Sequence, residues 1–376
     1  MGGTKDGGRQ QSPRWARWCA ILGVVLMVAS GGTLVLQQVL VKRYAGAVKT
    51  DDLFGDQAAA ASTGKVETVT TKSLKGPLNV LLVGVDPRDA SQEPRSDSII
   101  IAHIPSGLDS AYLFSIPRDT VVDIPAFPKA GYYGGRGKIN GAMANGSRRP
   151  GRTPSVAQGF ELLSKTVSAY TGIKRFDAGA IIDFSGFKKI VDAMGGVTMT
   201  IDQRVRSEHL QPDGSPRHLP YPGAHYTGPQ MVYEKGTHHL NGWQALDLVR
   251  QRYGLKNGDY DRQKHQQQFL KAMAAQALSA DVVTNPIKLD QVLRAAGQSL
   301  TFNGRGNSVV DFAFALKGLR GDDITMVRLK GGGIGTGSNY RGERLEPISQ
   351  DFFAAVQADT VATFLAAHPE LINDES

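Results

Sequence analysis

The fold is decided by residues 78 to 116, LNVLLVGVDPRDASQEPRSDSIIIAHIPSGLDSAYLFSI, in which three apolar runs are separated by Asp, Pro and Gly. The runs are LNVLLVGV (78 to 85), SIIIAHI (98 to 104) and AYLFSI (111 to 116). Short, continuous apolar runs are typical of strands that are covered on both faces. We therefore expect a sheet with helices on each side.

The segments that follow supply those helices. Helical patterns occupy residues 155 to 170, 185 to 194, 242 to 250 and 262 to 280, ITMVRL (324 to 329) is a late strand, and a final helix is expected near 350 to 367. The predicted fold class is α/β, a three-layer α/β/α domain with a central mixed sheet over residues 77 to 376. Residues 42 to 76, with the run of alanines 58 to 61 and a Thr-rich stretch, are interpreted as a linker or stalk.

The composition excludes several classes of protein. With 376 residues, 41% hydrophobic and 21% charged, the chain can bury a full core. The single cysteine, Cys19, excludes an intramolecular disulfide and a cysteine-based metal site. The formal charge of +8 suits an anionic partner, but zinc-finger spacing, heptads and a basic stripe with interleaved aromatics are missing, so nucleic acid is not expected.

An apolar segment near the N-terminus predicts a membrane anchor. Residues 18 to 36, WCAILGVVLMVASGGTLVL, contain no charged residue and are long enough to cross most of a bilayer, and we assign the anchor to 18 to 41. The basic residues of the preceding tail, 1 to 17, predict an N-terminus inside the cell and a domain outside the cytoplasm. The alternative is a signal peptide cut near Ala29, which the length of the run disfavours.

Two carboxylates lie at the ends of the first strands. Asp86 follows the first apolar run, and Asp97 stands just before the second. If those strands are neighbours, both carboxylates reach one edge of the sheet, where α/β proteins bind ligands. Two carboxylates, waters and a phosphate make a minimal Mg²⁺ site, whereas the alternative is that each Asp only caps a turn.

Arginines flank the same element ends. Arg95 precedes Asp97, Arg118 follows the third apolar run, and Arg250 and Arg252 end the segment NGWQALDLVRQR. The planar guanidinium group of arginine matches the oxygens of a phosphate. Several arginines at one site therefore predict that a pyrophosphate binds there. The alternative for any one of them is a surface salt bridge.

Further charged and polar residues lie at the start of the helix predicted from residue 262. Arg262 and Gln266 are four residues apart and share a helix face. Asp261 is interpreted as a possible N-cap, whereas Asp259, placed in the preceding loop, is the better candidate for a general base that takes a proton from a hydroxyl acceptor.

These segments together resemble the LytR-CpsA-Psr family. The matching stretches are NVLLVGVDPRD, RSDSIIIAHI, SIPRDTVVDIP, KINGAMANG, FDAGAIIDFSGFKKIVDAMGGVTMTID, GTHHLNGWQALDLVRQR and GDYDRQKHQQQFLKA, and they cover most of residues 77 to 281. The resemblance implies a membrane-anchored, Mg²⁺-dependent phosphotransferase. Such an enzyme moves a cell-wall glycopolymer, for example a teichoic acid, from a polyprenyl pyrophosphate carrier to peptidoglycan.

The resemblance also implies roles for individual residues. Asp86 and Asp97 are similar to the family's metal ligands, and Asp259 to its activating base. The residues similar to its pyrophosphate contacts are Arg95, Arg118, Arg250, Arg252, Arg262 and Gln266, of which Arg118, Arg250 and Arg252 are also expected to take part in catalysis. Apolar faces of the helices near 156 to 170, 185 to 194 and 266 to 280 are expected to form a tunnel for the lipid, with an ordinary core as the alternative.

Three further segments and a histidine pair carry weaker signals. The polar segments 128 to 153 and 204 to 237 are expected to be long loops that contact substrate, with surface excursions as the alternative. Residues 331 to 335, GGGIG, lack the rest of a phosphate loop and are predicted to be a mobile loop. His238 and His239 are assigned to a turn, and because they are adjacent they do not predict a zinc pair.

Two rival functions remain open from the sequence. A lipid pyrophosphate hydrolase would use the same groups with water as acceptor. A membrane-tethered glycopolymer binder or envelope regulator would need the basic residues but not the paired carboxylates.

Overall fold

The computed structural model describes residues 48–55, 74–86, 92–221, 224–277 and 286–373. The predicted anchor, 18 to 41, and the tail before it lie outside these residues. None of the helices in the described residues is long and apolar enough to cross a membrane.

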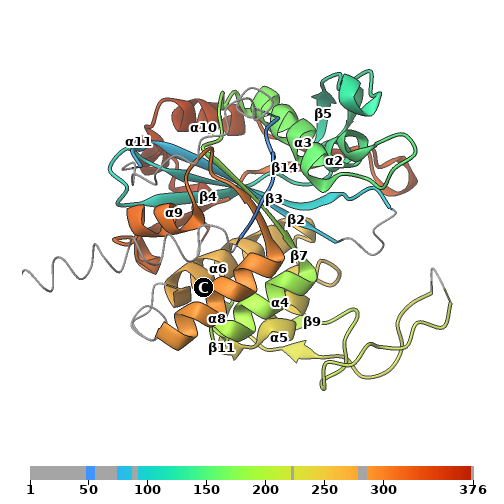
Figure 1. The fold of residues 1–376 in the computed structure, drawn as a ribbon. Coiled ribbons are helices and arrows are strands. Elements are labelled where there is room, and N and C mark those ends of the chain that lie inside the picture. Colours follow the sequence, from blue (N-terminus) through green and yellow to red (C-terminus); the bar gives the residue numbers. More distant parts are fainter. Residues whose placement is uncertain (1–47, 56–73, 87–91, 222–223, 278–285, 374–376) are drawn as a thin grey trace, which may run out of the picture. The chain divides into compact units, whose positions relative to one another are not determined.

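A seven-stranded mixed sheet forms the centre of the fold (Figure 1). Its strands, in spatial order, are β1 (Lys49–Thr50), β12 (Leu300–Asn303), β7 (Ala178–Asp183), β2 (Leu78–Val85), β3 (Ser96–Ile104), β4 (Ala111–Ser115) and β13 (Ile324–Val327). The three apolar runs of residues 78 to 116 form β2, β3 and β4, as strands were predicted there, and the three lie side by side in the sheet. The α/β class with a mixed sheet is confirmed.

The pairing of β2 with β3 positions the two aspartates. These strands are antiparallel, with Val85 opposite Ser96, so the end of β2 meets the start of β3. Asp86 and Asp97 therefore lie at the same edge of the sheet. They meet there because β2 and β3 are antiparallel neighbours, not because parallel strands end side by side.

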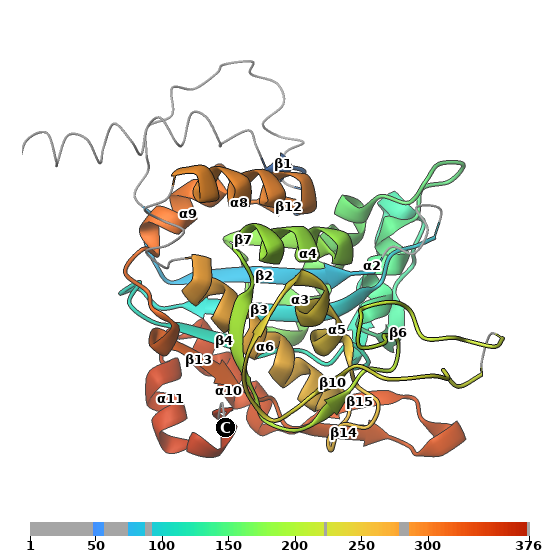
Figure 2. The ribbon, with the colours of Figure 1, turned by 90° about the horizontal axis from the view of Figure 1, so that it is seen from below.

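Helices cover both faces of the sheet (Figures 1 and 2). One face carries α2 (Asn140–Ser147), α3 (Val156–Thr171), α10 (Ile348–Gln357) and α11 (Val361–Ala367). The other carries α4 (Phe184–Ala193), α5 (Gly242–Arg250), α6 (Asp259–Ala277), α8 (Pro286–Ser299) and α9 (Val309–Ala315), and Figure 2 views the molecule from that side.

Local signals explain where several helices begin and end. The Ser155 side chain accepts from the backbone N–H of Gln158 at the start of α3, and Gly172, with φ of 72°, ends that helix. Asn241 and Gln244 form a capping box on α5. The predicted final helix is in fact two helices, α10 and α11, because Asp359 between them has a φ of 56° and breaks the helical path.

Within the described residues, four small two-stranded sheets lie outside the main sheet, and each includes a strand that falls wholly or partly in a segment predicted to be a loop. They pair β5 (Val121–Ile124) with β6 (Gly135–Lys138), β8 (Val197–Ile201) with β11 (Gly236–Leu240), β9 (Val205–Arg206) with β10 (Val232–Tyr233), and β14 (Gly331–Ile334) with β15 (Gly342–Leu345). The glycine run 331 to 335 is thus mostly a strand, and the assignment to a mobile loop is wrong. His238 and His239 lie on β11 rather than in a turn.

The predicted linker boundary is also wrong for residues 48 to 55. Strand β1 pairs in parallel with β12 at the edge of the main sheet. Leu53 and Phe54 are buried in the core, where the Phe54 ring meets the Phe160 ring of α3 edge-on at 5.6 Å between centroids. The folded domain therefore includes these residues, which lie well before the expected start at residue 77.

Candidate functional site

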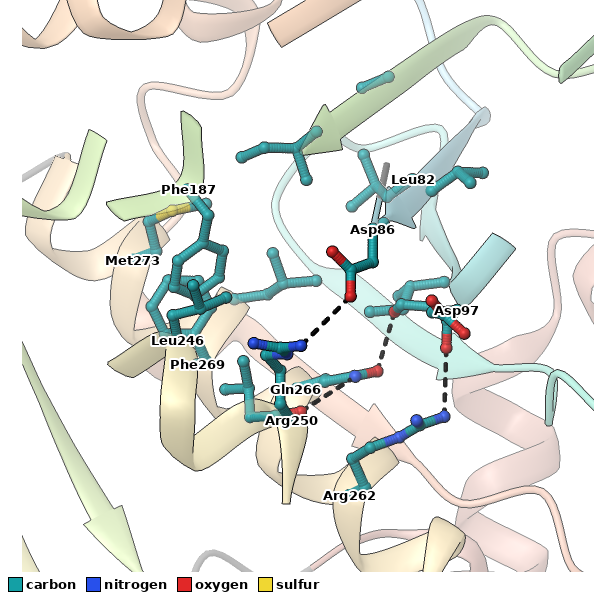
Figure 3. Close-up of a pocket in the computed structure, with 18 of the residues that line it drawn as sticks. Leu82, Asp86, Asp97, Phe187, Leu246, Arg250, Arg262, Gln266, Phe269 and Met273 are labelled. Carbon is teal, nitrogen blue, oxygen red and sulfur yellow. Dashed lines mark hydrogen bonds and ion pairs between the residues drawn. The ribbon is translucent and has the colours of Figure 1, made fainter. Parts of the chain in front are cut away.

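A cavity of about 630 Å³ lies between the sheet and the helices α4, α5 and α6 (Figure 3). Its volume is within the range of small-molecule sites. Seven of the nine residues predicted to form the site line it: Asp86, Asp97, Arg118, Arg250, Arg252, Arg262 and Gln266. Residues at the ends of β2, β3 and β4 and on or beside α5 and α6 thus come together at one place.

Arginine–carboxylate pairs form the charged end of this cavity. Arg250 Nη2 lies 3.2 Å from Asp86 Oδ2, and Arg118 Nη1 lies 2.5 Å from Asp97 Oδ1. Arg262 Nη2 donates to the backbone carbonyl of Asp97 at 3.1 Å. Figure 3 shows the Arg250 and Arg262 contacts reaching the strand ends from the helix side. Each carboxylate at this edge therefore has a guanidinium beside it.

Helix α6 brings Arg262 and Gln266 to the strand ends from one face. Gln266 Oε1 accepts from Ser98 Oγ at 2.8 Å, and its Nε2 donates to the carbonyl of Val249 at 3.2 Å. Gln266 therefore ties β3 to the last turn of α5, where Arg250 is located. This links β3, α5 and α6, three of the elements that carry the charged residues.

The guanidinium groups are partly or fully shielded from water. Burial lowers the pKa of Arg262, and the neighbouring Asp259 carboxylate opposes that effect. Burial also lowers the pKa of Arg118, but the charge and hydrogen bond of Asp97 outweigh it and leave the pKa raised. The Nε atoms of both arginines are buried and have no hydrogen-bond partner within the described residues. Each of these side chains therefore keeps one N–H donor that no described residue uses.

Asp259 and Arg95 are not among the residues that line the cavity. Asp259 is the first residue of α6, not part of the preceding loop, and its Oδ1 lies 2.8 Å from Arg262 Nη2. Its other oxygen accepts from Gln263 Nε2 at 3.2 Å. Asp259 thus adjoins the charged end through Arg262, whereas Arg95 is exposed.

Asp261 is not an N-cap. Its side chain accepts from the backbone N–H and the amide of Asn257, at 2.8 and 2.9 Å, and from Gln203 Nε2 at 3.0 Å. It therefore fastens the loop before α6 to the segment after β8, which helps to position the arginines on either side of that loop.

The remainder of the cavity is apolar. Its walls come from the sheet through Leu82, Ile100 and Phe302 and from the helices through Phe187, Phe269 and Met273. The expected tunnel helices 185 to 194 and 266 to 280 correspond to α4 and α6. The helix at 156 to 170 was wrongly included, because α3 packs on the opposite face of the sheet with Phe160 and Val167 in its core.

Sequence reasoning did not single out two residues with rings that line the cavity, His209 and Tyr253. Arg252 Nη2 donates to the hydroxyl of Tyr253 at 2.6 Å, and its guanidinium lies 4.6 Å from the ring centroid. Tyr253 directly follows a predicted arginine, which was an available signal. His209 lies in the segment 204 to 237, which was expected to contact substrate, but nothing in the local sequence singled out this residue.

Groups of three or more metal-ligating side chains are missing from the described part of the chain. Asp86 and Asp97, however, both line the cavity from neighbouring strand ends. Two carboxylates fit Mg²⁺, which keeps several waters and takes further oxygens from substrate phosphates. This donor set is compatible with Mg²⁺ bound together with a phosphorylated ligand.

The sequence is similar to those of known proteins. The chain is 30% identical over 287 residues to the cell wall biosynthesis protein LcpA of Corynebacterium glutamicum, a match that covers 68% of this chain and 50% of LcpA. It is 27% identical over 266 residues to the polyisoprenyl-teichoic acid–peptidoglycan teichoic acid transferase TagV of Bacillus subtilis, covering 70% of this chain and 59% of TagV. The chain thus spans about half the length of LcpA and 59% of TagV.

Solved structures show the same fold. The crystal structure of B. subtilis TagV matches with a TM-score of 0.57 and 24% sequence identity, over 76% of this chain and 98% of that chain. The model of the LytR_cpsA_psr family matches residues 45–352, which includes the β1 segment, the charged strand ends and all the arginines of the cavity. The chain therefore belongs to the LytR_cpsA_psr family.

Proposed function

We propose that this protein transfers a phosphorylated glycopolymer from a polyprenyl pyrophosphate carrier to peptidoglycan and forms a phosphodiester. The observation that carries the proposal is a single cavity with an arginine-rich end and an apolar interior. A lipid diphosphate has the same two parts. Family membership and the similarity to a teichoic acid transferase support the choice of a cell-wall glycopolymer.

The arginines bind the diphosphate and stabilise the charge that develops during transfer. A sugar hydroxyl of peptidoglycan attacks the phosphorus that carries the glycan, and the bond from that phosphorus to the bridging oxygen breaks. Polyprenyl phosphate leaves with the bridging oxygen and its charge. Arg118, Arg250, Arg252 and Arg262 are placed to neutralise this charge, so catalysis is mainly positioning and electrostatics.

Mg²⁺ would be held by Asp86 and Asp97 and would add positive charge beside the diphosphate oxygens. In the structure these carboxylates face Arg250 and Arg118. A bound diphosphate competes for the same guanidinium groups, which releases carboxylate oxygens from their ion pairs.

Asp259 is proposed to take the proton from the attacking hydroxyl. It adjoins Arg262 at the charged end but lies outside the cavity lining, so the acceptor would approach from the α6 side. A base outside the lipid cavity is compatible with an acceptor that arrives separately from the carrier.

We also propose that residues 18 to 41 anchor the protein in the cytoplasmic membrane, with the tail 1 to 17 inside and the catalytic domain outside. The uncharged run of residues 18 to 36 and the basic tail support this orientation. Protease treatment of intact, wall-stripped cells should cleave the domain and leave the tail protected; a domain that survives contradicts the orientation.

A transfer assay tests the proposal. The full chain in detergent micelles is incubated with a polyprenyl diphosphate glycan, peptidoglycan oligomers and Mg²⁺, and the products are analysed by mass spectrometry. A phosphodiester on peptidoglycan is expected, and chelation should abolish its formation. Free phosphoglycan as the only product would instead identify a hydrolase.

Variants in the same assay test the site. Arg118→Ala and Arg252→Ala should each reduce transfer by about a hundredfold or more, because each removes a guanidinium that stabilises developing charge. Exposed Arg175, far along the chain from the site, provides the control Arg175→Ala. Near-normal turnover in either site variant would contradict the scheme, and normal function of Asp97→Ala would favour a non-enzymatic binder.

A further inference from the structure

Residues 331–345 form a hairpin that does not line the cavity but contacts two segments that carry site residues. It consists of β14, a turn and β15, and its last residue, Leu345, is buried in the core. One of the two segments is the loop after β4, which carries Arg118, and the other is the first turn of α6, which begins with Asp259. The hairpin therefore connects two parts of the charged end that are distant in the sequence.

The contact with the loop of Arg118 runs along the backbone. The N–H of Glu343 donates to the carbonyl of Asp119, the residue after Arg118, at 2.8 Å. Gly342 makes this approach possible, because its φ is 141° and a Cβ at this position would lie 2.5 Å from the same carbonyl oxygen. From the other side, the N–H of Asn140 donates to the carbonyl of Arg118 at 3.1 Å. The backbone around Arg118 is thus held against the hairpin.

The contact with α6 is made by side chains. Glu343 accepts from the Tyr260 hydroxyl at 3.2 Å through one carboxylate oxygen and from the Tyr340 hydroxyl at 2.8 Å through the other. Tyr260 follows Asp259 in the first turn of α6, so the first of these bonds ties the start of the helix to the hairpin. Gly331 leaves room for the tyrosine, because a Cβ there would lie 2.7 Å from its hydroxyl.

Both tyrosines stay protonated and can donate to this carboxylate. Burial raises the pKa of Tyr260 above its ordinary value of 10.0, and the charge and hydrogen bond of Glu343 raise it further. Burial and the same carboxylate raise the pKa of Tyr340. The charge of Asp259 contributes to both shifts, as it does to the raised pKa of Arg118. Asp259 is therefore close to the hairpin as well as to Arg118.

We propose that Glu343 is a positioning residue for transfer, which acts through Tyr260 on Asp259. This inference rests on the proposed function, in which Arg118 binds the diphosphate and Asp259 takes the proton of the acceptor hydroxyl. The backbone of Glu343 holds the loop of Arg118, while its carboxylate holds the start of α6. Glu343 thus sets the separation between the donor and the base. Without the carboxylate, Asp259 shifts relative to the diphosphate, and a small misplacement of a reacting group slows the reaction steeply.

Steady-state kinetics of transfer by the full chain in detergent micelles test this role. Glu343→Ala and Tyr260→Phe should each lower kcat by about tenfold, because each removes the same hydrogen bond. The KM for the donor should stay within about twofold of the wild-type value, because the cavity that binds the donor is unchanged. Glu343→Gln keeps an acceptor oxygen for Tyr260 and should retain most of kcat. Arg344→Ala is the control, because this exposed neighbour points to the opposite face of β15 from Glu343.

Double variants test the route through Asp259. If Glu343 acts on Asp259, adding Glu343→Ala to Asp259→Asn should cause no further loss of kcat, because the base is already missing. Glu343→Ala combined with Tyr260→Phe should likewise be no slower than either single variant. The number of donor molecules bound per chain, measured by calorimetry, should equal that of the wild type in every variant, which separates slow chemistry from partial unfolding.

Three results would overturn the inference and leave the transfer function intact: a wild-type kcat in Glu343→Ala or Tyr260→Phe, a further loss of about tenfold in the Asp259→Asn background, or a similar loss in Arg344→Ala. Fewer donor molecules bound per chain in Glu343→Ala, with kcat per bound donor unchanged, would assign Glu343 to folding alone and would also overturn it. A wild-type protein that forms no phosphodiester would instead overturn the proposed function, and the inference with it.

Discussion

At the residue scale, the ion pairs at the strand ends are better explained by function than by stability. Asp86 and Asp97 are each beside an arginine, and all four side chains are partly exposed. Such pairs contribute roughly 0 to 1 kcal/mol to folding. They do, however, keep the guanidinium groups aimed at the edge of the sheet when no ligand is bound. A diphosphate would then find several guanidinium groups already oriented.

Asp259 has two possible roles at this scale, as a base or as an orienting partner of Arg262. If Asp259 acts as the base, Asp259→Asn should reduce kcat by about a hundredfold or more, because proton removal from the acceptor hydroxyl is lost. The KM for the donor should stay nearly constant, because donor binding does not depend on that proton transfer. The measurement is steady-state kinetics of the transfer reaction with wild-type and variant proteins. A variant that raises donor KM but keeps kcat would show that Asp259 only holds Arg262.

At the scale of elements, helix α6 decides the geometry of the charged end. It carries Arg262 and Gln266, and its position depends on Asp202 at the end of β8. Asp202 Oδ2 lies 2.8 Å from Lys264 Nζ, and its Oδ1 lies 3.0 Å from His265 Nε2. The hydrogen bond from His265, with a further one from Lys264, lowers the pKa of Asp202 well below its ordinary value of 3.8.

The shift of Asp202 predicts a pH-dependent contribution to stability. Because the folded-state pKa lies below the unfolded value, the carboxylate stabilises the fold above about pH 4, and the contribution disappears as the pH falls through the folded-state pKa. Asp202→Asn should lower the free energy of unfolding at pH 7 by about 1 to 3 kcal/mol.

Urea unfolding of wild-type and variant proteins from pH 7 to pH 2 measures this effect. The difference between the two curves should shrink towards low pH. A difference that stays constant over the whole range would contradict the assignment to Asp202.

The apolar walls predict a dependence on the carrier lipid. Met273 on α6 lines the cavity, and Met273→Trp should narrow it because indole is larger than the thioether chain. We expect weaker binding of a long polyprenyl diphosphate and unchanged binding of a water-soluble diphosphate sugar, measured by calorimetry. Met273→Leu, which conserves volume, is the control. Equal binding of the long carrier by both variants would argue that the chain lies elsewhere.

At the scale of the whole molecule, the segment 48 to 55 is part of the folded domain. Phe54 is buried against Phe160, and Arg305 lies over its ring at 4.2 Å. Phe54→Ala should therefore lower the free energy of unfolding by about 3 to 5 kcal/mol, as is usual for a buried phenylalanine.

Chemical denaturation of the two proteins provides the measurement. Lys49→Ala, an exposed change in the same segment, should alter stability by less than about 0.5 kcal/mol. If Phe54→Ala were as stable as the wild type, the interpretation of the segment as a linker would be restored.

The sequence alone determined the central strands, most of the helices and most of the site. Residues 78 to 85 and 98 to 104 can be predicted as strands from their sequence, because a short unbroken apolar run is typical of a strand that is covered on both faces. Asp86 and Asp97 could be selected because they directly adjoin those strands, and Arg118 because it follows the third apolar run, 111 to 116. Their chemical types then narrowed the ligand to an anion with several phosphate oxygens.

Only the tertiary structure decided the rest. Lys49 and Thr50 have no strand signal of their own, because β1 exists through its pairing with β12, some 250 residues later. Likewise, which helix faces the cavity was decided by the sheet: α3 and α6 are both partly apolar helices, but they cover opposite faces. His209 reached the cavity through Asp247 and Gln251, which lie about 40 residues away along the chain. Periodicity and spacing describe only near neighbours in sequence, whereas sheet order and buried polar networks join distant segments.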